Sequence, residues 1–325
     1  ENKVINKQII DEIINNKTML TIDNNFNVKN LLFNNYKKLI DNDNKLIIKK
    51  NTYQFICDFN KNLNLVALTY TGKVINIDWK KHLNRDYKID NKLLNNINPY
   101  EIINFHNFNE NKENYLCILC KDGRFKKILY DNEMLKTNRS FSIIKTKKDN
   151  KILNSFISKQ NMKLIIISSI GRLFKYELDN KFIAPVSKQA QGIILNKLLP
   201  REEIISCCTC RTDDQIVILT KKGNFFKLNE NEIYNSYNSK LGFIDRKIQI
   251  KNDAFLSIIT DKKSCEILTN KGRSAKINFS KLKINANTKK YDLEYLDFEK
   301  DEYINNIYIA EKSNWLRLIF HFYPI

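Results

Sequence analysis

Five of the seven glycines in this chain recur at a nearly constant interval, each closing a similar phrase of apolar and β-branched residues. They are Gly72, Gly123, Gly171, Gly223 and Gly272, separated by 51, 48, 52 and 49 residues. A sixth copy of the phrase begins at Met19 and has Asn24 or Asn25 where the others have glycine. Asparagine tolerates positive φ better than most residues, so it suits the same turn. A repeat of this length predicts a ring or array of similar units.

Each unit is predicted to contain four strands. In the fifth, the apolar run 216–220, the turn at Gly223 and the run 224–228 are typical of a β-hairpin. A second strand–turn–strand pattern follows, as in 192–206 and 242–257. Four strands in each repeat are typical of a propeller-type blade, and packing blades side by side covers their faces. We therefore expect an all-β fold, a propeller-like ring of six four-stranded antiparallel blades.

The predicted ring occupies residues 18–325, and residues 1–17 carry the convincing helix signals and are predicted to be a connector. The chain lacks an initiating methionine and a signal-peptide pattern, so we expect a fragment or processed form of a longer protein. No run of 18 or more apolar residues is present, and no membrane span or membrane partner is predicted. Seven cysteines, an odd number, favour a reducing compartment over a disulfide framework.

Positive charge dominates the 325-residue chain, with 55 lysines and arginines against 36 acidic residues, a net charge of +19. Such an excess favours a polyanionic partner, nucleic acid first and an anionic membrane second. A purely compositional enrichment in lysine is the alternative.

The cations keep register with the glycines. Four residues after each turn lie Lys29, Lys127, Lys175, Lys227 and Lys276, with Asn76 in the second unit. One residue after the glycine lie Lys73, Arg124, Arg172 and Arg273, with Asn224 in the fifth unit. Repeated around a ring, these nine cations predict a positive belt that contacts DNA phosphates with little sequence preference. Alternatively, they only protect strand edges and improve solubility.

The repeated phrase resembles that of the C-terminal domain of the DNA gyrase A protein, from the type IIA topoisomerases. The resemblance covers about residues 17–310 and is closest at 188–200 and 216–227, where a glycine-containing segment leads to a hairpin ending in Lys227. It implies a six-bladed β-pinwheel that exchanges strands between neighbouring blades and bends or wraps duplex DNA around its rim. In that family, this activity serves strand passage and supercoiling.

The resemblance also implies what this chain lacks. The catalytic tyrosine of the family lies in an upstream core, which the connector at 8–14 would join, and the ATP site lies on the partner protein, gyrase B. No catalytic site and no cofactor are therefore expected here, while the parent enzyme would use ATP and magnesium elsewhere. The implied partners are double-stranded DNA, the rest of the gyrase A protein and the gyrase B protein. The implied location is a plastid such as the apicoplast, or the bacterial cytoplasm and its nucleoid.

The chain departs from the family pattern in one respect. Family members that wrap DNA chirally carry a basic, glycine-rich heptapeptide after the first blade, whereas residues 36–45 here have cations but no glycine. The domain could therefore bend DNA without wrapping it, or wrap it through other contacts.

Other site patterns are weaker. Cys117 and Cys120, and the group Cys207, Cys208 and Cys210, have spacings that suggest zinc. Cys117 and Cys120, however, occupy columns of the repeat that face opposite sides of a strand, which disfavours joint ligation. No phosphate-binding loop is present, and a protein-interaction propeller and a propeller enzyme remain the rival interpretations.

Overall fold

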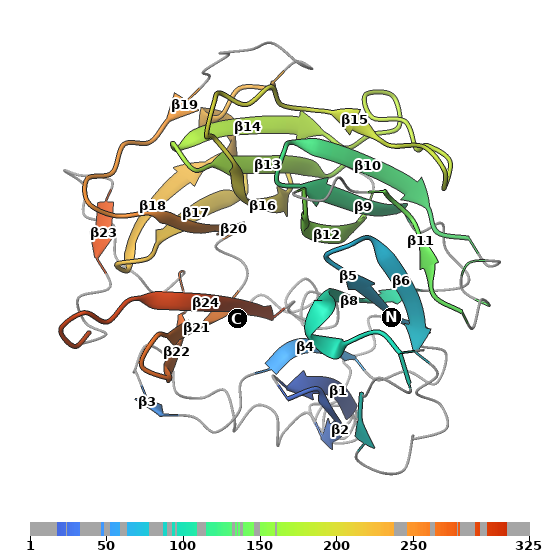
Figure 1. The fold of residues 1–325 in the computed structure, drawn as a ribbon. Coiled ribbons are helices and arrows are strands. Elements are labelled where there is room, and N and C mark those ends of the chain that lie inside the picture. The colour runs from blue at the N-terminus through green and yellow to red at the C-terminus, as the bar shows by residue number, and fades with distance from the viewer. Residues whose placement is uncertain are drawn as a thin grey trace, which may run out of the picture.

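The strands of the protein are arranged in a ring in the computed structural model (Figure 1). The structure describes residues 18–23, 25–32, 47–48, 53–58, 64–77, 87–89, 93–94, 96–108, 115–131, 134, 136, 139–145, 150–159, 161–236, 246–260, 264–277, 279, 290–292 and 298–310. The predicted connector at 1–17 and the region 36–45 lie outside this part of the chain. No described helix is long and apolar enough to cross a membrane.

The described strands form six four-stranded antiparallel sheets, here called blades 1–6. In spatial order, blade 1 contains β4 (Tyr53–Asp58), β1 (Thr18–Asp23), β2 (Asn27–Leu32) and β7 (Tyr87–Lys88). Blade 2 contains β8 (Ile102–Phe108), β5 (Asn64–Thr69), β6 (Lys73–Ile77) and β11 (Phe141–Ser142). Blade 3 contains β12 (Ile152–Ser158), β9 (Tyr115–Cys120), β10 (Arg124–Leu129) and β15 (Ile193–Ile194).

The remaining blades follow the same order. Blade 4 contains β16 (Ile204–Cys210), β13 (Lys163–Ser168), β14 (Arg172–Glu177) and β19 (Arg246–Lys247). Blade 5 contains β20 (Phe255–Thr260), β17 (Gln215–Thr220), β18 (Asn224–Asn229) and β23 (Lys290–Asp292). Blade 6 contains β24 (Ile304–Ala310), β21 (Ser264–Thr269), β22 (Arg273–Ile277) and β3 (Ile47–Ile48). The predicted all-β, six-bladed pinwheel is confirmed.

Strand exchange joins each blade to the next. The third strand of every repeat leaves its own unit and pairs with the second strand of the preceding blade, as β11 pairs with β6 and β15 with β10. The same rule closes the ring, because β3 of the first repeat pairs with β22 of blade 6, with Arg273 opposite Ile48. The fourth strands, such as β12, β16 and β20, line the centre of the ring, and the exchanged strands β11, β15 and β19 lie at its edge (Figure 1).

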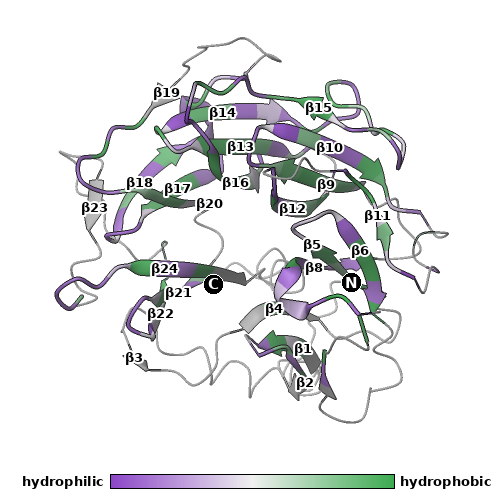
Figure 2. Ribbon diagram, viewed as in Figure 1, coloured by the Kyte–Doolittle hydropathy of each residue, from purple (hydrophilic) through white to green (hydrophobic). Residues whose placement is uncertain are grey.

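Apolar side chains pack between the facing sides of neighbouring blades and hold the blades together. Figure 2 shows hydrophobic residues concentrated on the first strand of each hairpin, such as β5, β9, β13 and β17. Successive residues of these strands pack in different clusters: Cys117 in one with residues of blade 4, Cys120 in another with residues of blade 2. The two cysteines therefore face opposite sides of β9, as the repeat columns predicted.

The hairpin glycines have positive φ, from +76° at Gly272 to +90° at Gly72. The exchanged strand explains why a side chain is excluded at Gly171. The Gly171 carbonyl accepts a hydrogen bond from the amide of Ile248 (2.9 Å), and a Cβ on Gly171 would lie 2.1 Å from the Ile248 carbonyl oxygen. The exchanged segment thus packs directly against the turn of the blade that it completes.

The prediction for the first hairpin is wrong by one or two positions. Phe26, rather than Asn24 or Asn25, takes the place of glycine: its φ is +62°, and its carbonyl accepts from the amide of Ile89 in the exchanged segment. The carboxylate of Asp23 accepts from the amides of Asn25 (2.8 Å) and Asn27 (3.0 Å), which fixes this turn without glycine. The register of the first unit shifts accordingly.

Candidate nucleic-acid interface

The cations four residues after the glycine connect neighbouring blades. The Lys127 side chain is 3% exposed, and its Nζ donates to the Leu178 carbonyl (2.5 Å) and to Asn180 Oδ1 (2.7 Å) in the connection that follows β14 of blade 4. In the second unit Asn76 has this position, and it receives a hydrogen bond from the Tyr130 hydroxyl beyond β10 (3.0 Å). Burial lowers the pKa of Lys127.

Lys175 makes the corresponding link from blade 4 to blade 5. Its Nζ lies 2.6 Å from Glu230 Oε1 and also donates to the Glu230 carbonyl (3.2 Å). Lys163 Nζ lies 2.9 Å from the same carboxylate oxygen. Burial alone would raise the pKa of Glu230, but hydrogen bonds from the two lysines lower it below its usual value. The carboxylate therefore stays ionised between two cations.

The cations one residue after the glycine form ion pairs within their own blades. Arg172 is fully buried, and its Nε and Nη2 lie 2.8 and 2.5 Å from the two carboxylate oxygens of Glu202. Arg273 and Glu302 make the same two-pronged pair in blade 6. Hydrogen bonds from Arg273 lower the pKa of Glu302 to about 2. In blade 5 the equivalent contact joins Asn224 Nδ2 to Asp253 Oδ2 (2.9 Å).

The same position differs in blades 2 and 3. Lys73 is exposed, and the Arg124 side chain is 24% exposed, with its Nε 3.9 Å from Asp122. The residue that would correspond to Glu202 is Tyr100 in blade 2 and Asn150 in blade 3, since each lies two positions before the residue that pairs with the end of the first strand. Neither supplies a carboxylate.

The remaining predicted cations lie on second strands. Lys29 is exposed on β2 and, after the register correction, lies three residues past the turn, so Asn30 takes the position equivalent to Lys127. Lys227 and Lys276 are half-buried on β18 and β22, where Lys276 pairs across the hairpin with Glu266.

The expected belt of nine exposed cations is therefore corrected. The structure buries Lys127, Arg172 and Lys175, because these side chains satisfy carbonyls and carboxylates at joints inside and between blades. Engaged in these contacts, the three side chains are not available to phosphate. Whether the others contact DNA stays a prediction.

Exposed cations of the described residues are instead numerous at one end of the ring, where the hairpin turns and the turns before the fourth strands lie side by side. The Lys121 amide donates to the Lys151 carbonyl (3.1 Å), and the Lys221 amide to the Ala254 carbonyl (2.8 Å). Hydrogen bonds from Ile152 to Tyr70 and from Ile204 to Lys121 connect the turns of successive blades. We call this end the hairpin face. Its exposed cations include Lys73, Lys145, Lys151, Lys197, Arg201, Lys221, Lys222, Lys251, Lys271 and Lys300.

Acidic residues are fewer on the hairpin face, and some pair with its cations. Lys121 lies 3.6 Å from Glu203, and Lys271 lies 2.9 Å from Glu299. At the opposite end, carboxylates are interspersed with cations, as at Asp179 beside Lys181 and at Asp213 near Arg211. Among the described residues, the excess of exposed cations over carboxylates is therefore larger on the hairpin face.

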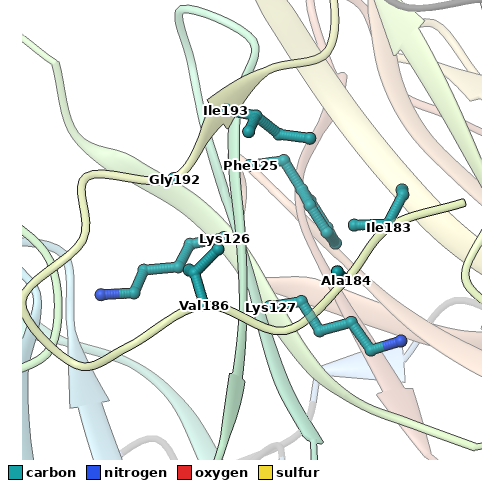
Figure 3. Close-up of a pocket in the computed structure, with 8 residues that line it drawn as sticks. All are labelled: Phe125, Lys126, Lys127, Ile183, Ala184, Val186, Gly192 and Ile193. Atoms are coloured by element: carbon teal, nitrogen blue, oxygen red, sulfur yellow. The ribbon is translucent and has the colours of Figure 1, made fainter. Parts of the chain in front are cut away.

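A crevice on the outer side of blade 3 shows how the edge is fixed (Figure 3). Lys126 and Lys127, consecutive on β10, point in opposite directions there. The buried Lys126 Nζ donates to the carbonyls of Ile143 (2.5 Å), Lys188 (2.7 Å) and Ala190 (2.7 Å), so it joins two exchanged segments. Burial lowers its pKa to about 8. The two lysines at this crevice therefore serve as structural ties.

No metal site is formed by the residues that the structure describes. Six cysteine side chains are described, and all are buried thiols: Cys117, Cys120, Cys207, Cys208, Cys210 and Cys265. Burial raises the pKa of Cys117 and Cys210 to about 12, so these thiols stay protonated.

Sequence reasoning missed the ion pairs, although a signal was present. Glu202 and Glu302 recur at one place in the repeat, thirty and twenty-nine residues after Arg172 and Arg273. Acids at blade turns are readily explained as turn residues, and the turns do use these two: Glu202 accepts from the Leu199 amide (2.8 Å) and Glu302 from the Glu299 amide (2.9 Å). Correlating acid with cation across repeats would have predicted the pairs.

Comparison with known proteins places the chain by its fold. No family model and no curated protein sequence matches it. Solved structures with a similar fold include the following three. One is the C-terminal domain of DNA topoisomerase IV, with a TM-score of 0.67 and 15% identity over 91% of this chain and 93% of that one. A second is the DNA gyrase A C-terminal domain, with a TM-score of 0.66 and 15% identity over 91% of this chain and all of that one.

The third is the E. coli ParC C-terminal domain, with a TM-score of 0.51 and 10% identity over 72% of this chain and 98% of that one. The predicted resemblance is confirmed for the fold: this chain has the β-pinwheel architecture of the gyrase A and topoisomerase IV C-terminal domains.

Proposed function

We propose that this chain binds duplex DNA without sequence preference through the hairpin face and the adjoining edge of the ring, and bends it. The observation that carries the proposal is the recurrence of exposed lysine or arginine along the hairpin face from blade 2 to blade 6. Lysines on successive turns around a ring suit a curved phosphate backbone better than base edges, because their long side chains act as separate point charges. The net charge of +19 supports the same partner.

The fold supports a role in a larger enzyme. We propose that the chain acts as the DNA-bending domain of a type IIA topoisomerase, presenting a duplex for strand passage and supercoiling. The rest of the gyrase A protein and the gyrase B protein would be its partners, and they would hold the catalytic tyrosine, ATP and magnesium. A plastid such as the apicoplast, or a bacterial nucleoid, remains the proposed location.

Salt dependence of binding tests the proposal. A fluorescently labelled 40-base-pair duplex is titrated with protein between 50 and 300 mM salt, and the slope of log affinity against log salt is measured. Six phosphate contacts predict a slope of about −5, since each contributes about −0.9. Absence of duplex binding at 50 mM salt, or binding without salt dependence, would contradict the proposal and favour the protein-interaction alternative.

Matched variants locate the surface. Replacing Lys73, Arg124 and Lys151 with alanine removes three cations from the hairpin face, whereas replacing Lys159, Lys181 and Arg211 removes three from the other end of the blades. We expect the magnitude of the salt slope to fall by about 3 in the first variant and to stay unchanged in the second. Equal effects would mean that net charge, rather than the hairpin face, determines binding.

Bending and wrapping are separate outcomes. Energy transfer between dyes at the two ends of the duplex should rise on binding if the DNA bends. A linking-number shift in relaxed circles closed by ligase would add chiral wrapping, whereas closure without a shift would restrict the function to bending.

A further inference from the structure

We infer that blades 2 and 3 provide the principal anchor for the duplex, because only there among the described blades does the cation after the hairpin glycine lack a buried carboxylate partner. The inference rests on the proposed function and specifies which part of the hairpin face binds most strongly. The inference starts from the position one residue after the hairpin glycine, where the contacts of the cation differ between blades. Arg172 and Arg273 are held by the buried carboxylates of Glu202 and Glu302, whereas Lys73 has no such acid and Arg124 has only the partly exposed Asp122, 3.9 Å from its Nε.

The equivalence of these positions is geometric. The end of the first strand pairs with Ile204 in blade 4, with Ile304 in blade 6, with Ile102 in blade 2 and with Ile152 in blade 3. Two residues before each of these lie, in the same order, Glu202, Glu302, Tyr100 and Asn150. Tyr100 is 77% exposed, and Asn150 Oδ1 accepts weakly from the Asp122 amide (3.3 Å).

Charge around Lys73 and Arg124 strengthens the contrast. Both lie beside exchanged strands, opposite Ser142 and Ile194, and therefore at the outer margin of the hairpin face. Four more exposed lysines lie near blades 2 and 3: Lys145, Lys151, Lys188 and Lys197. Lys151 Nζ lies 4.8 Å from the centroid of the Tyr70 ring and Lys188 Nζ lies 4.0 Å from that of Phe141, so cation–π contacts hold the ammonium groups of these exposed residues at the surface.

Carboxylates dilute the corresponding surface of blades 5 and 6. Asp253 accepts from the amides of Lys222 (3.1 Å) and Ala254 (2.7 Å), and Glu299 and Asp301 flank Lys300. These acids repel phosphate beside the cations of that surface. A duplex that lies along the hairpin face is therefore held most tightly at β6 and β10 and more weakly toward blade 6.

Two double variants with equal charge loss test the inference on the 40-base-pair duplex. Lys73→Ala with Arg124→Ala should reduce the magnitude of the salt slope by about 2, because each lost phosphate contact contributes about 0.9 to it. The duplex affinity should then fall roughly 50-fold at 0.1 M salt. Lys222→Ala with Lys251→Ala should reduce affinity less than about 5-fold. Far-UV circular dichroism confirms that both variants fold.

A complementary variant adds the missing acid. Asn150→Glu places a carboxylate where Glu202 lies in blade 4 and should pair with Arg124, lowering the slope by about 1 without removing a cation. Ala254→Glu adds the same charge in blade 5 and should leave the slope unchanged. Equal losses from the two double variants, or no loss from Lys73→Ala with Arg124→Ala, would overturn the inference while DNA binding by the wild type stands. Failure of the wild type to bind would overturn the proposed function as well.

Discussion

The buried pair of Arg172 and Glu202 gives the sharpest test of the distinction between structural and DNA-facing cations. Both side chains are 0% exposed, and two hydrogen bonds of 2.8 and 2.5 Å join them. Arg172→Ala would leave the Glu202 carboxylate with uncharged donors such as the Leu199 amide. Breaking a buried pair in this way costs about 3–5 kcal/mol. We expect a value toward the upper end of this range, because the guanidinium also donates to the Lys197 carbonyl (3.2 Å).

Urea unfolding followed by far-UV circular dichroism measures this loss. With a slope of about 3 kcal/mol per molar urea, the midpoint should fall by roughly 1 M or more. The control variant replaces both partners with apolar residues, Arg172→Met with Glu202→Leu. Its free energy of unfolding should lie within about 1 kcal/mol of the wild-type value. Its duplex affinity should also be unchanged. If Arg172→Ala kept the wild-type midpoint but weakened DNA binding, Arg172 would be a surface cation and the reasoning would be refuted.

Three further predictions concern the joints of the ring. Gly171→Ala should cost about 3 kcal/mol of stability, because the new Cβ would collide with the Ile248 carbonyl at a position with positive φ. Gly272→Ala should cost only about 1 kcal/mol, because no atom lies within 4 Å of the new Cβ. Equal midpoints of thermal unfolding for the two variants would contradict this. The pair of Arg273 and Glu302 should stabilise the fold above pH 4.5 and lose about 2 kcal/mol as pH falls to about 2, since the pKa of Glu302 is lowered in the folded state; Glu302→Gln should lack this slope in acid titration. Lys126→Met should cost about 2 kcal/mol by leaving three carbonyls without their donor, and should speed proteolysis of segment 186–192; an unchanged cleavage rate would argue against this tie.

Much of the architecture could be predicted from the sequence because the hairpins combine a long apolar first strand with a glycine turn. The destination of the third strands could not be predicted from the residues alone. β11, β15 and β19 are two residues long, too short to show an alternating pattern, and the blade that each completes is set by packing against a distant hairpin. Here the family resemblance supplied the strand exchange that periodicity could not.

The prediction of the first hairpin turn was wrong for a different reason. Asn24 and Asn25 satisfied the rule for positive φ, yet Phe26 adopts that conformation and packs edge-on against Tyr100, with ring centroids 5.4 Å apart. Tertiary packing thus overrode a local preference. Because the register of Lys29 was counted from the wrong residue, one error in the turn displaced a candidate site residue as well.

The cations were assigned to DNA because they recur at fixed positions after the glycines. In a ring of repeats, however, such recurrence can also result from the joints between blades. Blades that are joined in the same way can use the same side chain at each joint: Lys127 and Lys175 both donate to carbonyls of the following blade. A binding surface need not be used equally by all blades. Positions that depart from the repeat are therefore better indicators of function than positions that keep it. Tyr100 and Asn150, which replace the buried acid that holds the arginine in blades 4 and 6, are such departures, and this is why the anchor is assigned to blades 2 and 3.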